Sequence, residues 1–435
     1  MIIDYASLVA HLGRTSGLPP PPARGERDVA AATMSIEPFT RSFTQQEPIP
    51  EAAIAAAVEV MRSGRLHRYN TIEAEVPAAS ALERAYADYQ GARYCLACAS
   101  GGTALQLALR ACGLAPGERV LTNAFTLAPV PGAIVAAGGR PVLVETTEDL
   151  VIDLADLEVK AAGSGARFLL VSHMRGHLVD MDALMALAGR CGLTVIEDCA
   201  HTMGAAWRGR KSGNFGRVAC FSTQTYKHMN SGEGGLLTTD DAELAARAIV
   251  LSGSYMLYER HGAAPPAEVV ERIRLETPNN SGRMDNLRAA ILLPQLAELD
   301  ANVARWNTRY RAIEARLARV AALVLPVRPP EELYVGSSIQ FRIPGIAPDD
   351  ARRFVVDARA LGVELKWFGA PEPVAFTSTH ASWTYLERQA LPRTDRVLAG
   401  LFDMRIPLTF SVDDCRHIAD IIAHCAERLS LEGAA

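Results

Sequence analysis

The sequence predicts an α/β protein in which a large, mostly parallel sheet domain precedes a small α+β domain. Between about residues 92 and 240, short apolar runs alternate with helical patterns, several of which end at glycine. Strands that alternate with helices pair as parallel sheets with both faces covered. A long helical stretch then extends from Met284 to about Val320, and shorter strand and helix patterns follow it. This change of pattern predicts the second domain.

Composition limits the classes of protein to which the chain can belong. Its 435 residues are 49% hydrophobic and have a formal net charge of −5, which suits a globular protein of two or three domains. Acidic residues outnumber basic ones and no basic block occurs, so we expect no nucleic-acid partner. No apolar run is long enough for a membrane span. The first residues lack a basic leader and include Asp4, so we expect a cytoplasmic protein.

The cysteines do not indicate a metal site. Eight cysteines are scattered along the chain, and Cys95 and Cys98 form the single C-x-x-C pair. A zinc site would need a second such pair or suitably spaced histidines. We therefore expect buried thiols in a reducing compartment, and no bound metal.

The domain boundaries follow from composition and pattern. Residues 1–45 are predicted to be an N-terminal extension, because four successive prolines favour an extended linker and exclude a helix. The large domain is predicted over residues 46–305 and the small domain over residues 306–435. No repeat or low-complexity tract interrupts either domain.

The expected elements have recognisable ends. Glycine is favoured just after a helix, which places the end of an Ala-rich helix at Gly64. In the large domain, apolar strands are expected near Val120, Arg140, Arg167, Leu193 and Val218, with helices from Thr103 and Met181. In the small domain, strands are expected from Ser338 and Val363, with helices from Asp349 and after Ser411.

Polar residues follow three of the predicted strands, where ligands bind in parallel sheets. Asp198 ends one strand, Lys227 follows another, and Gly102 and Thr103 open a helix. A helix N-terminus can hold a phosphate, a carboxylate can pair with a protonated pyridine nitrogen, and a lysine can form a Schiff base with an aldehyde. Together these groups describe a site for pyridoxal 5'-phosphate (PLP). Singly, each has a simpler explanation, such as a solvated lysine at a strand end.

Six ordered motifs between about residue 48 and the C-terminus resemble those of the DegT/DnrJ/StrS family of sugar aminotransferases, which are fold-type I PLP-dependent enzymes. The motifs are S-G-R-L-H-R-Y at Ser63, S-G-G-T-A-L at Ser100, H-M-R-G-H-L-V-D-M-D-A-L at His173, V-I-E-D-C-A-H-T-M-G-A at Val195, F-S-T-Q-T-Y-K-H-M-N-S-G-E-G-G at Phe221 and S-G-R-M-D-N-L-R-A-A-I-L at Ser281.

The resemblance implies a role for each matching position. Lys227 would form the Schiff base with the cofactor and act as the acid and base of the reaction. Asp198 would pair with the pyridine nitrogen and His201 would contact the ring. The phosphate would be bound by Gly102, Thr103 and Ser222, and by Asn280 and Arg283 of a neighbouring subunit, so the resemblance also implies a homodimer with shared active sites.

The chain also departs from the family pattern. Leu127 occupies the place of the aromatic residue that stacks on the cofactor, and Phe125 is an alternative for that role. The segment 254–278 is longer than usual, and it either shapes a substrate pocket or forms a surface loop.

Two further residues, Tyr69 and His173, are predicted to contact the substrate.

Arg175 has two interpretations. It follows a predicted strand, where it could contact an anionic group of the substrate. A structural ion pair explains an arginine at such a position equally well.

The resemblance implies amino transfer from glutamate or glutamine to a keto-sugar, often nucleotide-linked, or to a cyclitol. The same cofactor also supports elimination, cyclisation, decarboxylation or aldol-type cleavage of an amino acid. A non-catalytic regulatory protein on the same scaffold is a third hypothesis, although such a protein would not need Lys227. A nicotinamide-dependent dehydrogenase is excluded because no G-x-G-x-x-G follows a predicted strand.

Overall fold

The computed structural model describes residues 36–72, 75–254, 257–375 and 377–432. Contacts group residues 38–435 into one compact unit, which is the part considered below. The predicted proline-rich linker lies outside the described residues.

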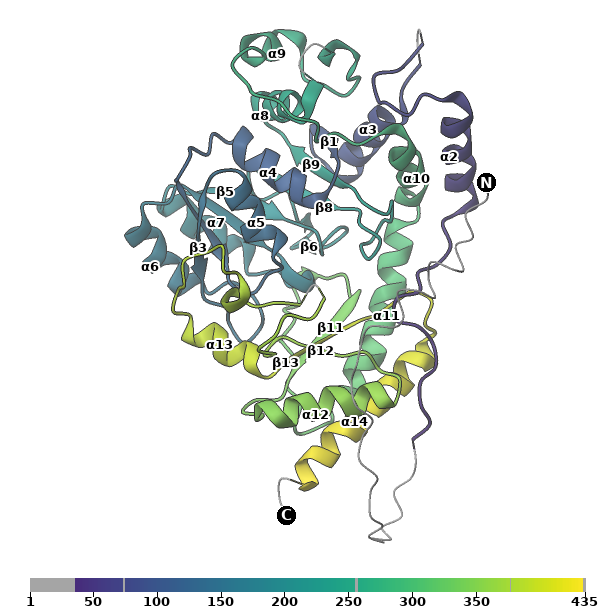
Figure 1. Cartoon of the computed structure of the whole chain (residues 1–435), viewed down its shortest axis with the longest axis vertical. Coiled ribbons are helices and arrows are strands. Elements are labelled where there is room, and N and C mark those ends of the chain that lie inside the picture. The colour runs from purple at the N-terminus through teal and green to yellow at the C-terminus, as the bar shows by residue number, and fades with distance from the viewer. Residues whose placement is uncertain (1–35, 73–74, 255–256, 376, 433–435) are drawn as a thin grey trace, which may run out of the picture. The chain divides into compact units, whose positions relative to one another are not determined.

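A seven-stranded sheet forms the centre of this unit (Figure 1). Its neighbouring strands are parallel, except that β9 runs antiparallel to β1 and to β8. The sheet thus confirms the predicted mostly parallel architecture. In spatial order the strands are β1 (Tyr94–Cys98), β9 (Gly235–Thr239), β8 (Val218–Ser222), β5 (Thr194–Asp198), β4 (Phe168–Ser172), β2 (Arg119–Asn123) and β3 (Arg140–Val144).

Helices cover both faces of the sheet because alternate strand residues point to opposite sides. Val120 packs in one buried cluster with Leu105, whereas Leu121 packs in the other cluster with Leu184. The first cluster includes side chains of α4 (Gly101–Ala111), α5 (Pro129–Ala136) and α8 (Ala242–Ile249). The second includes side chains of α3 (Ala78–Gln90), α6 (Leu154–Ser164), α7 (Met181–Arg190) and α10 (Asn286–Leu296).

A smaller antiparallel sheet follows, with strand order β11-β13-β12. Helix α10 is followed closely by α11, which leads from the large sheet to the small one (Figure 1). The predicted domain boundary at residue 305 falls inside α11, so one helix belongs to both predicted domains. The elements are α11 (Leu299–Leu317), β11 (Ser338–Arg342), α12 (Pro348–Ala360), β12 (Lys366–Trp367), β13 (Leu401–Arg405) and α14 (Val412–Glu432).

The remaining elements are short or peripheral. Helix α2 (Glu51–Ser63) ends at Gly64 with a left-handed backbone, where the sequence predicts the end of a helix. A second three-stranded sheet has the order β10-β6-β7. Its strands are β6 (Ala206–Trp207), β7 (Arg210–Lys211) and β10 (Glu332–Leu333). The other short α-helices are α9 (Ala267–Ile273) and α13 (Pro392–Ala399). Short helices of other types are η1 (Met174–Gly176), η2 (Val250–Ser254), η3 (Tyr258–Arg260) and η4 (His380–Ser382).

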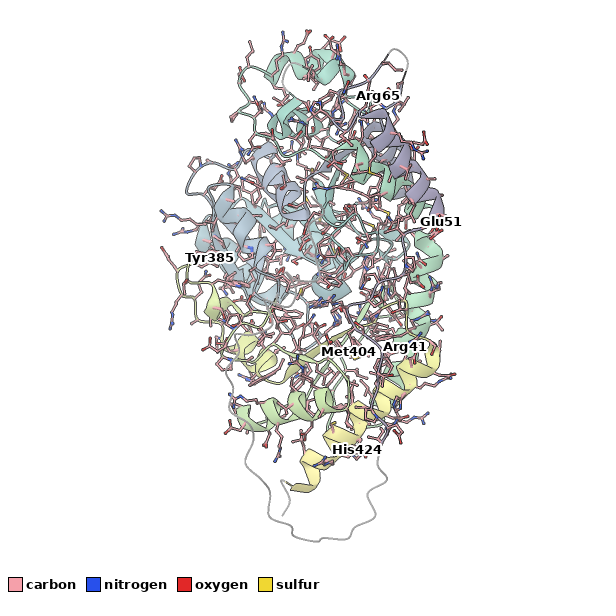
Figure 2. All side chains as sticks on the ribbon, turned by 45° about the vertical axis from the view of Figure 1, so that its right-hand side comes forward. Arg41, Glu51, Arg65, Tyr385, Met404 and His424 are labelled. Atoms are coloured by element: carbon pink, nitrogen blue, oxygen red, sulfur yellow. The ribbon has the colours of Figure 1, made fainter. Side chains whose placement is uncertain are left out.

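Residues 38–45 pack against the small sheet's helices. The rings of Phe39 and Phe43 contact Phe410 edge to face, with centroids 5.0 and 4.9 Å apart. The N–H of Phe39 donates to the carbonyl of Leu361 at 2.9 Å. Arg41, labelled in Figure 2 beside α14, forms an ion pair with that helix. The last part of the predicted extension therefore forms a packed arm.

The arm supplies a test of this packing. Gly362 has a φ of +81°, and a Cβ there would overlap the carbonyl oxygen of Phe39. Gly362→Ala should lower the Tm more than Gly345→Ala, which has a φ of +73° but open space around it. Both variants incur about 1–2 kcal/mol for the left-handed backbone, and Gly362→Ala must in addition displace the arm. Thermal unfolding and limited proteolysis at Arg41 measure the difference, and equal Tm values would contradict the packing.

Candidate active site

A cavity of about 250 Å³ opens at the carboxyl ends of the parallel strands. The final residues of β4, β5 and β8, which are Ser172, Asp198 and Ser222, all line it. The small sheet contributes Lys366 and Arg405 to the same wall. This is the edge of a parallel sheet at which ligands bind.

The amine of Lys227 lies in this cavity, 3.0 Å from Nε2 of His201. Desolvation, followed by the positive charge of Arg175, lowers the pKa of Lys227 to about 7. Desolvation and the charge of Lys227 hold the pKa of His201 well below its ordinary value, so the imidazole is neutral. A large fraction of the amine is therefore unprotonated near neutral pH, which makes it a nucleophile.

The carboxylate of Asp198 is held by two donors. Its Oδ2 accepts a hydrogen bond from the Ser172 hydroxyl at 2.7 Å, and its Oδ1 accepts one from the N–H of Ala200 at 3.1 Å. Ser172 in turn accepts from the hydroxyl of Thr126 at 2.9 Å. Thr126 and Ser172 line the cavity but were not predicted, although both follow predicted strands.

The start of α4, where a phosphate is expected, lies at the cavity. Gly101 lines the cavity, and a Cβ there would lie 2.9 Å from the Cβ of Ser222, so the close approach requires glycine. The predicted Thr103 is used differently. Its N–H donates to the Ser100 side chain at 3.0 Å, and its hydroxyl lies 2.9 Å from the same oxygen. The cavity is therefore lined by Gly101 and Ser222. The predicted residues Gly102 and Thr103 are not part of its lining.

The aliphatic residue predicted over the cofactor ring does lie in the cavity wall. Leu127 lines the cavity together with Pro129 and Val130. Phe125 is 1% exposed and packs edge to face on Phe368, with ring centroids 5.2 Å apart. The structure therefore places Leu127, and not Phe125, where it can cover a bound ring.

Besides Gly102 and Thr103, the predicted residues Tyr69, Asn280 and Arg283 lie outside this cavity. The hydroxyl of Tyr69 bonds to Ser254 and, at 3.0 Å, to Nδ1 of His261. Arg283 donates to the carbonyl of Gly253 at 3.1 Å, and Asn280 is exposed. The predicted contact of Asn280 and Arg283 with the phosphate of a neighbouring subunit stays a prediction.

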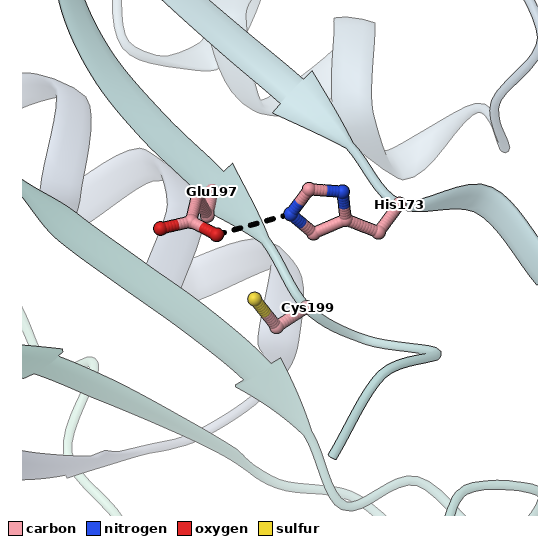
Figure 3. Close-up of side chains that lie close together, drawn as sticks. All are labelled: His173, Glu197 and Cys199. Atoms are coloured by element: carbon pink, nitrogen blue, oxygen red, sulfur yellow. Dashed lines mark hydrogen bonds and ion pairs between the residues drawn. The ribbon is translucent and has the colours of Figure 1, made fainter. Parts of the chain in front are cut away.

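His173 has a different environment from the one predicted (Figure 3). Its Nε2 lies 3.1 Å from Oε2 of Glu197, and Cys199 completes a buried group. Glu197 also accepts N–H bonds from residues 213, 215 and 216, so its oxygens are occupied. Burial raises the pKa of the Cys199 thiol, which stays protonated. These contacts make the group a structural network that fixes the loop between β7 and β8, and the side chain of His173 does not line the cavity.

Arg175 forms a structural ion pair, and its contact with a substrate anion stays a prediction. Its Nη2 lies 2.7 Å from Oδ2 of Asp403, which makes a buried ion pair. Arg175 also lines the cavity next to Lys366 and Arg405. The sequence did not indicate Lys366 and Arg405, because both lie within strands of the small domain.

Comparison with known proteins identifies the family. The DegT/DnrJ/EryC1/StrS aminotransferase family matches residues 48–423. The chain belongs to this family. Its members are PLP-dependent enzymes, and the fold is that of fold-type I PLP-dependent transferases.

The similar proteins include ones named for a sugar and for a cyclitol. GDP-perosamine synthase of Caulobacter vibrioides is 36% identical over 55% of this chain, and L-glutamine:2-deoxy-scyllo-inosose aminotransferase of Streptoalloteichus tenebrarius is 37% identical over 57%. These matches span 62% and 58% of the two relatives, which is less than two thirds of their length. The solved structure of S. venezuelae DesV is 29% identical, has a TM-score of 0.72, and covers 86% of this chain and 94% of its own.

The residues present fit PLP. When bound, the cofactor supplies an aldehyde and an electron-withdrawing pyridine ring. The amine of Lys227 suits the aldehyde, and Asp198, fixed by Ser172, suits the ring nitrogen. Gly101 at the start of α4 and Ser222 at the end of β8 suit the phosphate.

The lowered pKa of Lys227 predicts a pH dependence. Attachment of PLP to the empty protein should accelerate with rising pH, with a midpoint near 7, because only the unprotonated amine reacts. Arg175→Met removes a positive charge that lowers this pKa, so the midpoint should move to higher pH. Stopped-flow absorbance measures the rates, and Arg352→Met on the surface of α12 is the control. A midpoint that Arg175→Met leaves unchanged would contradict the electrostatic coupling.

Proposed function

We propose that the protein is a PLP-dependent aminotransferase that moves an amino group from glutamate or glutamine to a keto-sugar or cyclitol. The observation that supports this most directly is the Lys227 amine, whose pKa is lowered to about 7, in one cavity with the fixed carboxylate of Asp198. The relatives described above act on sugars and on a cyclitol, which supports the same class of acceptor.

The residues of the cavity divide the work. Lys227 binds the cofactor and moves a proton to and from the substrate carbon, for which a pKa of about 7 suits both directions. His201 contacts the amine as a neutral imidazole. Asp198 would hold the ring nitrogen of the cofactor, and the hydroxyls of Ser172 and Thr126 hold Asp198 in place. Leu127 would cover the ring and exclude water.

We further propose a homodimer in which each subunit completes the site of the other. Tyr69, Asn280 and Arg283 are away from the cavity of their own chain. The neighbouring segments also expose large apolar side chains, including Ile72 at 65% and Leu275 at 87%. Exposed apolar side chains of this kind are typical of a surface that pairs with another copy.

A cytoplasmic location is proposed on the basis of the cysteines. All eight are free and most are buried, which suits a reducing compartment. Among the described residues, no helix has the length and apolar character needed to cross a bilayer.

The central test concerns Lys227. Lys227→Ala should still bind PLP through the start of α4 and through Asp198, but the cofactor should not become covalently attached. Borohydride reduction followed by mass spectrometry detects attachment, and the amine product from glutamate measures turnover. We expect at least a ~10⁴-fold loss of turnover, because the acid and base are both removed. Lys211→Ala, a lysine on the peripheral strand β7, is the control. Normal turnover in Lys227→Ala would refute the proposed chemistry.

The shared site can be tested by complementation. Lys227→Ala and Arg283→Ala should each be inactive alone. After subunit exchange, a mixed dimer has one site with both native residues, so about a quarter of all sites should recover. Turnover of the mixture measures the recovery, and a mixture of two Lys227→Ala preparations is the control. Failure to recover, with exchange shown by native mass spectrometry, would exclude shared sites.

A further inference from the structure

Three basic side chains lie on the side of the cavity that holds Lys227. Arg175 follows β4, Lys366 belongs to β12 and Arg405 ends β13, and all three line the cavity. After desolvation, their positive charges are what lowers the pKa of Lys227, so they act close to its amine. The phosphate is expected at Gly101, which belongs to α4, a different element. The three cations are therefore not needed for that phosphate.

Their positive charge is only partly balanced. Asp403 is fully buried and pairs with Arg175 at 2.7 Å, while Nζ of Lys366 lies 3.6 Å from the same oxygen. Gln340 donates to the other oxygen of Asp403 at 2.8 Å, which fixes the carboxylate behind the cations. One buried carboxylate thus faces three cations.

The other acidic residues that line the cavity do not neutralise this excess of positive charge. Asp198 is held by Ser172 and by a backbone N–H, and it is assigned to the ring nitrogen of the cofactor. Glu233 is exposed to solvent, where its charge is screened.

Arg405 has hydrogen-bonding capacity left over. Its guanidinium carbon lies 3.7 Å from the centroid of the Tyr226 ring, which holds the side chain in the cavity wall. Its Nη1 is buried, and it has no hydrogen-bond partner among the described residues. Nε of Arg175 is also buried and has no hydrogen-bond partner among the described residues. Buried donors without partners are costly, and an anion in the cavity would satisfy such a donor.

We propose that Arg175, Lys366 and Arg405 form an anion subsite that binds a carboxylate of the substrate beside Lys227. Guanidinium groups match the planar geometry of a carboxylate, and Lys366 adds a point charge. The proposal rests on the proposed amino transfer and narrows its substrate. The carboxylate belongs either to the amino donor or to an acidic group close to the carbonyl of the keto acceptor.

Binding of an unreactive dicarboxylate tests the subsite without turnover. Calorimetry on the PLP-loaded protein should show binding of glutarate and no binding of its neutral diamide, glutaramide. Arg405→Met and Lys366→Met should each weaken glutarate binding by about tenfold or more, because each removes a charge-assisted contact. Arg405→Lys should retain part of the affinity, and Arg352→Met, exposed on α12, should match the native protein. PLP affinity, measured by absorbance, should stay within about twofold in all of them.

The source of the carboxylate is decided by the separate half-reactions. Single-turnover reactions with glutamate are monitored by the absorbance of the cofactor. Their rates give the glutamate concentration at half-saturation. If Arg405→Met raises this concentration, the subsite holds the donor. If glutarate binding is lost while the glutamate half-reaction is unchanged, the subsite holds an acidic acceptor, and that class of acceptor should then be screened.

Several results would overturn the proposal. The proposal is wrong if the native protein does not bind glutarate. It is also wrong if Arg405→Met and Lys366→Met bind glutarate as tightly as the native protein does. A fall in PLP affinity without a fall in glutarate affinity would instead assign the cations to the cofactor phosphate. If the native protein transfers amines from glutamate and the variants behave like it, the subsite alone is wrong. If the native protein does not take up PLP, the proposed function fails, and the subsite fails with it.

Discussion

The site depends on keeping the amine of Lys227 unprotonated near neutral pH. A lysine in water is protonated at that pH and cannot attack an aldehyde. Here desolvation and the nearby charge of Arg175 lower its pKa to about 7, while the carboxylate of Asp198 opposes them. His201, 3.0 Å away, is neutral and adds no charge of its own. The balance among these groups sets the reactivity of the lysine.

This balance requires that the large sheet and the small sheet keep a fixed position relative to each other. Asp198 and Ser222 come from the large sheet, whereas Lys366 and Arg405 come from the small one. Trp306 of α11 links them. Its indole N–H donates to the carbonyl of residue 406, just after β13, at 3.1 Å, and its ring packs 5.2 Å from that of His228, the neighbour of Lys227. A shift of the small sheet would therefore change both the position of the cations and the surroundings of the lysine.

Much of the large domain was predictable, because its strands are short apolar runs between helices and their polar ends meet at one edge. Placement at strand ends was enough to select Lys227 and Asp198 as candidates. The same argument extends to Ser172 and Thr126, which also lie at or just after strand ends. Strand β9 was not predicted, because the short run G-L-L-T-T directly follows a glycine-rich loop. Periodicity alone does not distinguish such a run from the end of the loop.

The remaining site residues could not be found from local patterns. Lys366 and Arg405 reach the cavity only because β12 and β13 pair in a sheet whose order the sequence does not reveal. His173 and Ser172 are adjacent in the chain, yet one bonds to buried Glu197 and the other to Asp198 in the cavity. Which of two neighbours faces a cavity depends on where the strand ends, and sequence patterns locate element ends least precisely.

The proposed anion subsite would couple substrate binding to the protonation of the lysine. Arg175, Lys366 and Arg405 all lower the pKa of Lys227 while their charges are unbalanced. A carboxylate bound among them would cancel part of this effect, so the pKa of Lys227 would rise when the substrate arrives. The lysine is then a better nucleophile in the empty site and a better proton acceptor in the occupied one. These are the two tasks that amino transfer sets for the same amine in succession, and a single cluster of cations serves both.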